Sequence, residues 1–169
     1  KLGILTTTGL LIAIGFASGV KAENVSHVKQ LLETNKCTKC DLTGAQLAGM
    51  NLSGADLSGA DLSGANLSGA NLNEAKLNGA NLKQAKLQGA SLIAAKMHGA
   101  NLESADLSRA NLSLAGLVIA SLKNTNLTSA NLVGVNLESA DLAGANLRNA
   151  RQSVANLANV SLRGGSLSG

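Results

Sequence analysis

Leucine recurs at every fifth position of this chain from Leu42 to Leu167, and the frame never slips. Alanine usually stands two residues before each leucine, with Asp or Asn often between the two. On an α-helix a step of five residues turns by about 500°, so these leucines cannot form one apolar stripe. On a continuous strand they would alternate between two faces. The pattern therefore predicts short extended segments joined by corners and stacked into a parallel β-solenoid with inward leucines.

The recurring positions predict the core of the solenoid, and Met97 and Gln152 are the two departures from leucine there. Met97 is similar to leucine in volume, so it acts as a filler. Burying the Gln152 amide without a partner costs about 1–3 kcal/mol, so we expect a loosened last coil there. The predicted central core positions are Leu52, Leu57, Leu62, Leu67, Leu72, Leu77, Leu82, Leu87, Leu92, Met97, Leu102 and Leu107.

The unit Ala-(Asp/Asn)-Leu-x-x, seen at residues 55–59 and 65–69, resembles the pentapeptide repeat family. The resemblance covers residues 41–169. It implies an all-β solenoid, namely a right-handed quadrilateral parallel β-helix with about 20 residues per coil. The number of sides comes from the family, because the period alone does not give it. Outward residues that are twenty apart in the sequence are then expected to stack on one another.

Residues 1–22 are expected to be a secretory signal peptide, because Lys1 precedes an apolar run at residues 10–17 and small residues flank Lys21. A retained anchor is the alternative, although the run is short for a membrane span. The mature chain would begin near Glu23, and losing Lys1 and Lys21 lowers the formal net charge from +4 to +2. The chain does not begin with Met, so its true start stays open.

Residues 23–40 are expected to form a capping segment ahead of the array at 41–169. A short α-helix over residues 24–36, with Asn24 or Ser26 as its N-cap, should cover the N-terminal end of the solenoid. Its apolar face would contain Val25, Val28, Leu31 and Leu32. Exported cyanobacterial and plastid members of the family are similar here, which implies a periplasm or thylakoid lumen. No comparable cap follows Leu167, so the last coil is expected to fray or to meet a partner.

Cys37 and Cys40 are the two cysteines of the chain, and three interpretations of this pair are open. An oxidising compartment favours a structural disulfide, which stabilises by about 2 kcal/mol in the loop-entropy account. The spacing also suits reversible redox exchange, although no thioredoxin-like βαβ pattern surrounds it. Zinc is the third interpretation, but it needs more ligands than His27 and His98 supply.

Charged residues form two predicted ladders on the outer surface. The first contains Lys83, Glu103, Lys123 and, farther on, Arg163, and the second contains Asp56, Lys76 and Lys96, with His98 beside the last. Exposed ion pairs contribute about 0–1 kcal/mol each, so a solvated charged face is the default interpretation. The alternative is that the two stacked lysines hold an anion.

Apolar residues at outward positions are the more informative departures from the repeat. Ile93, Leu114, Val133 and Val154 fall on the same side of four successive coils, and Val118 and Ile119 lie around the next corner. A contiguous exposed apolar patch usually marks an interface. We interpret these six residues as a candidate interface for self-association or for another protein. Scattered apolar residues without a role are the alternative.

The composition argues against several classes of function. Catalysis needs converging groups in a pocket, and the repeat offers no nucleophile–base pair with motif support, so no catalytic, cofactor or metal residues are expected. Phe16 is the one aromatic residue, which disfavours nucleic-acid binding, and the slightly positive charge disfavours a DNA-mimicking gyrase-protection protein. The sequence therefore predicts a non-enzymatic, exported protein-binding or scaffold module without a stable membrane anchor. The alternative is a redox-regulated binding protein switched by the cysteine pair.

Overall fold

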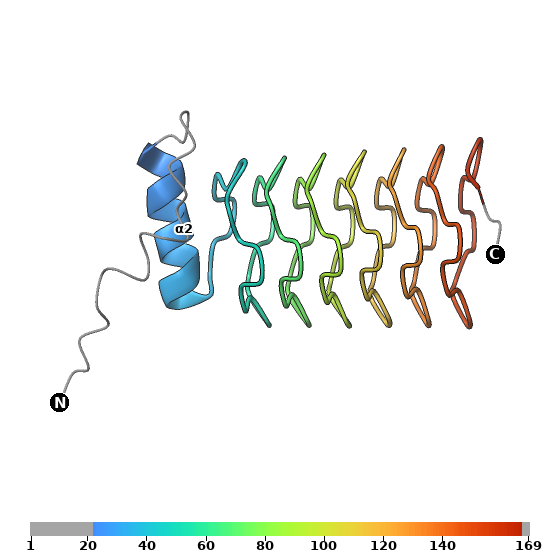
Figure 1. Ribbon diagram of the computed structural model, residues 1–169, viewed down its shortest axis with the longest axis horizontal. Helices are drawn as coiled ribbons and strands as arrows, with labels where there is room; N and C mark the ends of the chain where they lie inside the picture. The colour runs from blue at the N-terminus through green and yellow to red at the C-terminus, as the bar shows by residue number, and fades with distance from the viewer. Residues whose placement is uncertain (1–21, 167–169) are drawn as a thin grey trace.

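The computed structural model describes residues 22–166, which form one helix followed by a solenoid of stacked coils (Figure 1). Helix α2 spans Ala22–Thr34. Parallel bridges then join residues twenty apart, from Lys36↔Asp56 to Asn146↔Ser166. This register gives four five-residue sides per coil, and the fold is a right-handed quadrilateral parallel β-helix, as predicted. The predicted signal peptide lies outside the described residues, apart from Ala22.

Each corner of the solenoid is a β-turn that follows the inward leucine. In the first complete example, the Ala45 N–H donates to the Leu42 carbonyl at 3.0 Å. The residue before that alanine position has a positive φ at every corner from Lys39 to Gly164, as a type II turn requires. The Asp or Asn of the repeat caps the turn, because its Oδ1 accepts the N–H two residues on, as Asp61 does from Ser63 at 2.9 Å.

The interior of the solenoid is filled by the leucines and alanines of the repeat. All twelve predicted central core positions, Met97 included, are at most 1% exposed. Thr125 replaces one of the alanines and is also fully buried, and its Oγ1 donates to the Leu102 carbonyl at 2.8 Å. The buried hydroxyl therefore keeps a partner, as a polar group in a core must.

Helix α2 covers the N-terminal end of the solenoid, with Val28 and Leu31 buried against the first coil (Figure 1). It begins and ends two residues earlier than predicted. The predicted N-cap at Asn24 or Ser26 is therefore wrong, because both residues lie inside the helix. The buried Asn24 side chain instead donates from Nδ2 to the Thr43 carbonyl at 2.6 Å, which ties the helix to the first coil.

The helix ends at Thr34 because Asn35 takes a left-handed conformation, with φ of 57°. The coils then start at Lys36, five residues before the predicted boundary at residue 41. Cys37 occupies a leucine position of this first side, and its N–H donates to the Asp56 carbonyl at 2.7 Å. Cys40 occupies the following alanine position. Both side chains are apolar and fit these inward positions, so the cysteine pair lies inside the solenoid.

Exposure rises in the last described coil. Gln152 is half-buried there and Leu157 is 38% exposed, since no further coil covers them within residues 22–166. The Gln152 amide therefore avoids the burial cost that we expected. The coil still pairs with the one before it, as shown by the Arg151 N–H, which donates to the Ala130 carbonyl at 2.9 Å.

Truncating a leucine should cost stability according to its place along the solenoid. We expect Leu107→Ala, in a fully buried position, to lower the free energy of unfolding by about 2–5 kcal/mol. The matched variant Leu157→Ala should cost clearly less, because that side chain is already partly in water. Chemical denaturation followed by circular dichroism measures both losses of stability. Equal losses would contradict the idea that leucine contributes less where it is less buried.

Candidate functional site

The candidate interface residues lie at two adjacent corners of the solenoid. Leu114, Ile119 and Val154 are 67%, 55% and 87% exposed. Ile93, Val118 and Val133 are half-buried. Parallel bridges join Ser91, Asn111, Asn131 and Arg151, so the corner that follows these residues recurs in four successive coils. This corner contains Ile93, Leu114, Val133 and Val154, as the sequence predicts. Three large apolar side chains thus project into solvent along one part of the molecule.

The backbone at the three exposed apolar residues is strained. Leu114, Ile119 and Val154 have φ values of 61°, 53° and 55°. An L-residue pays about 1–2 kcal/mol for this left-handed conformation, and β-branched residues are the least tolerant of it. Gly64 occupies the same position in another turn and adopts a positive φ without that cost. The fold therefore gains little from bulky apolar side chains here, and strain of this kind often accompanies function.

Two of the exposed apolar side chains, Leu114 and Ile119, reach along the solenoid axis toward glycines of neighbouring coils. Leu114 covers Gly134, where an added Cβ would come within 2.9 Å of the leucine Cδ2. Ile119 reaches toward Gly99, at 4.0 Å from the corresponding Cβ position. The glycines give these side chains room to extend across two coils, which broadens the apolar surface beyond single turns.

Gly116 is a further unusual residue, and the sequence interpretation missed it. It stands on the side between Leu114 and Val118, at the position where the repeat has Asp or Asn. Its φ is not left-handed, and a Cβ added there would meet nothing within 4 Å. The available signal was that no other pentad of the array carries glycine at this position.

The charged ladders form largely as expected, with one change of partner. Lys83 pairs with Glu103 at 3.2 Å and Lys76 with Asp56 at 3.6 Å. Lys123 pairs with Asp141 at 3.1 Å. Lys123 therefore pairs outside the first ladder, although the signs of Lys83, Glu103 and Lys123 alternate as expected. Lys96 stacks on Lys76 through a parallel bridge, and His98 beside it is exposed, as is Arg163 farther along.

Asp106 has the most elaborate environment among the acidic residues. Partial burial raises the pKa of its carboxyl group, but hydrogen bonds outweigh this effect and hold the pKa below its ordinary value of 3.8. Asp106 Oδ1 accepts from the Ser108 N–H at 2.9 Å and from Asn126 Nδ2 at 3.1 Å. Oδ2 accepts from Gln88 Nε2 at 2.8 Å. This carboxylate is engaged in capping its own turn and linking three coils.

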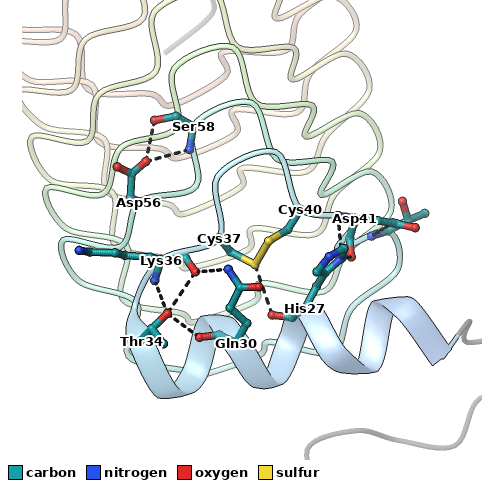
Figure 2. The surroundings of a disulfide bond; sticks show 10 residues. His27, Gln30, Thr34, Lys36, Cys37, Cys40, Asp41, Asp56 and Ser58 are labelled. Carbon is teal, nitrogen blue, oxygen red and sulfur yellow. Dashed lines mark hydrogen bonds between the residues drawn. A yellow bond between two sulfur atoms is a disulfide. The ribbon is translucent and has the colours of Figure 1, made fainter.

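The cysteine pair is bonded in the structure and lies between the first coil and α2 (Figure 2). The Cα atoms of Cys37 and Cys40 are 5.3 Å apart, and their side chains are 0% and 4% exposed. Cys37 Sγ lies 3.3 Å from the His27 carbonyl oxygen. His27 Nδ1 accepts the Asp41 N–H at 3.1 Å, so the imidazole is directed at backbone. Within residues 22–166 no three His, Cys, Asp or Glu side chains gather as a metal site requires.

The family model for pentapeptide repeats matches residues 40–79, 75–113 and 120–151, which is more than half of the sequence. The chain belongs to the pentapeptide repeat family. A pentapeptide repeat protein from the Arabidopsis thaliana thylakoid lumen is a similar solved structure, with 37% identity and a TM-score of 0.52. The match covers 53% of this chain and 63% of that one, so this pentapeptide repeat protein spans less than two thirds of the Arabidopsis structure.

Cyanobacterial pentapeptide repeat structures are also similar. One from Nostoc PCC 7120 is 37% identical over 57% of this chain and 78% of that chain, with a TM-score of 0.51. One from Cyanothece 51142 is 28% identical over 83% and 92%, with a TM-score of 0.48. No curated protein sequence matches this pentapeptide repeat protein. No helix within residues 22–166 has the length and apolar character needed to cross a membrane.

Relieving the strain at an apolar corner should stabilise the fold. We expect Ile119→Gly to raise the free energy of unfolding by about 1 kcal/mol, because glycine adopts positive φ freely. The reciprocal variant Gly64→Ile should lower it by about 1–2 kcal/mol, since a Cβ there meets no neighbouring atom and only the backbone cost remains. Urea denaturation measures both, and a destabilised Ile119→Gly would mean that Ile119 is retained for packing.

Acid should destabilise the protein partly through Asp106. Because its folded pKa lies below the unfolded value, its contribution is present above about pH 4 and is lost as the pH falls through the folded pKa. Asp106→Asn keeps an oxygen for the Ser108 N–H but cannot titrate. Its urea midpoint should therefore decline less between pH 5 and pH 2.5 than that of the parent. Identical declines would show that Asp106 contributes no acid sensitivity.

Proposed function

We propose that this chain is a non-enzymatic, exported protein-binding or scaffold module whose partner docks on the apolar corners. The observation that carries the proposal is the combination of exposure and strain at Leu114, Ile119 and Val154. A fold selected for stability alone would place glycine or a small polar residue at each of these corners. Bulky apolar side chains that cost stability and contact water are accounted for if another protein covers them.

The remaining surface supports a binding role rather than catalysis. Pentapeptide repeat proteins are generally structural or binding modules. In the described part of the chain, the carboxylates with lowered pKa values are Asp56, Asp106 and Asp141, and each is held by hydrogen bonds that cap a corner. They therefore stay ionised and act on the backbone of their own turn. Neither general acid–base chemistry nor a nucleophile follows from this arrangement.

Export to a thylakoid lumen or periplasm is part of the same proposal. The leader at residues 1–22 supports it, because the basic Lys1 precedes an apolar run there. The disulfide between Cys37 and Cys40 also supports it, because such bonds persist in oxidising compartments. The similar Arabidopsis structure is that of a pentapeptide repeat protein from the thylakoid lumen.

The structure favours a structural clip over the redox-regulated alternative. Both sulfur atoms are buried between the first coil and α2, so a thiol reagent has little access to them. The His27 carbonyl oxygen beside Cys37 Sγ would disfavour a thiolate there, because its partial negative charge would face the sulfur. We therefore expect reduction to require movement of α2.

The proposal predicts that charge at the apolar corner abolishes partner capture. The full chain serves as bait in extract from its own compartment, beside the double variant Leu114→Lys with Val133→Lys. Ser63→Lys with Ala143→Lys, on a different corner, is the matched control. We expect captured protein to fall at least tenfold for the first pair only, because a buried lysine at an interface costs more than about 1.4 kcal/mol.

The same capture is repeated with oxidised and reduced bait. Unchanged capture supports the clip, whereas loss on reduction supports the redox-regulated alternative. Equal capture by the parent and by the Leu114→Lys, Val133→Lys variant would show that the apolar corner is not the docking surface.

A further inference from the structure

One side of the solenoid, with its flanking corner residues, forms what we call the Gly116 face. We define it by the five central positions around Gly116 that successive parallel bridges join, namely Lys76, Lys96, Gly116, Asn136 and Asn156. The same side continues toward α2 through Asp56 and Lys36. The outward residues two positions before the central ones are Glu74, Ala94, Leu114, Gly134 and Val154, and the outward residues two positions after them are Asn78, His98, Val118, Glu138 and Ala158. The face is thus a grid of five rows with three outward residues each.

The centre of this face is low because Gly116 has no side chain, whereas Leu114 projects beside it. The fold does not require glycine there, since the φ is ordinary and a Cβ would meet nothing within 4 Å. Asp or Asn at this position would instead add an oxygen for the Val118 N–H, as Asn136 provides for Glu138 at 3.1 Å. A glycine that lowers local stability and opens the surface fits a place where another backbone approaches closely.

Charge is distributed unevenly along the face. The row before Gly116 contains Lys96 and His98, and the row after it contains Asn136 and Glu138. Lys96 has no ion pair within residues 22–166, whereas its neighbour Lys76 pairs with Asp56. The face therefore has a basic row on one side of Gly116 and an acidic group on the other.

We propose that the Gly116 face binds the same face of a second copy of this chain, with the two solenoids antiparallel and the two-fold axis at Gly116. This proposal rests on the proposed function and names its partner. The two-fold operation exchanges the rows on either side of Gly116. His98 then faces Glu138 of the second copy, Lys96 faces its Asn136, and both contacts occur twice.

The shape of the face fits this antiparallel arrangement. Leu114 lies over Gly134 of its own chain, so it occupies one side of the two-fold axis. Leu114 of the second copy is displaced in the opposite direction, where it meets the small Ala94. The two leucines therefore pack side by side. A parallel arrangement would place Lys96 against Lys96 of the second copy, and this like-charge contact disfavours it.

The size of the face predicts a weak dimer. It has five rows of three residues, whereas stable complexes use about 20–30 residues on each side. We therefore expect reversible association that depends on protein concentration.

The first experiment is sedimentation equilibrium of the full chain over a range of concentrations, together with Gly116→Asn. That substitution restores the repeat and its turn cap, so the thermal midpoint should stay equal or rise. Self-association should weaken at least tenfold, because the new side chains meet at the axis. Ser121→Asn, at the same pentad position on the next side, is the matched control and should leave the dimer intact. A parent that is monomeric at every concentration overturns the proposal.

The second experiment tests the antiparallel pairing by charge exchange. Glu138→Lys and His98→Glu should each weaken the dimer at least fivefold, and the two changes together should restore it to within twofold of the parent. Single variants without effect, or a double variant as weak as the singles, overturn this pairing. A further outcome is that the parent is monomeric while Leu114→Lys with Val133→Lys still abolishes its capture of another protein. That result overturns the second copy as the partner but leaves the proposed function standing.

Discussion

The structure depends on backbone hydrogen bonds that close only if each coil returns after twenty residues. The Leu62 N–H donates to the Asn81 carbonyl of the next coil at 2.7 Å, and the Asp61 N–H donates to the Cys40 carbonyl of the previous coil at 2.9 Å. An inserted or deleted residue would leave buried backbone groups without partners. The five-residue frame is therefore kept from the first side to the last, and the inward leucines follow from it.

Corners and outward positions are where this constraint leaves freedom. Glycine occupies fewer than half of the corners, although every corner requires a positive φ. Polar residues such as Asn124 tolerate that conformation comparatively well. Leu114 and Ile119 tolerate it less well and are also exposed, so they differ from the glycine and polar residues at most other corners.

The N-terminal end shows how the solenoid hides its first coil. Helix α2 buries Val28 and Leu31, and the side chains of Asn24 and His27 bond to backbone groups of Thr43 and Asp41 on the second side. The disulfide takes the places of a leucine and an alanine directly beneath the helix (Figure 2). The helix, the disulfide and the first coil therefore pack together as one unit.

The sequence by itself determined the solenoid and its inward residues, because a strict local period leaves few ways to bury leucine. The stacking of outward residues twenty apart came from the four-sided coil that the family resemblance implied, and the parallel bridges confirm it. It did not determine the partner of Lys123, the role of Asn24 or the start of the coils at Lys36. Those features depend on which groups from distant coils meet, as when Asn73 Oδ1 accepts the Ile93 N–H at 3.0 Å. Gly116 was visible in the sequence, but only the tertiary structure showed that neither its backbone nor its neighbours require glycine.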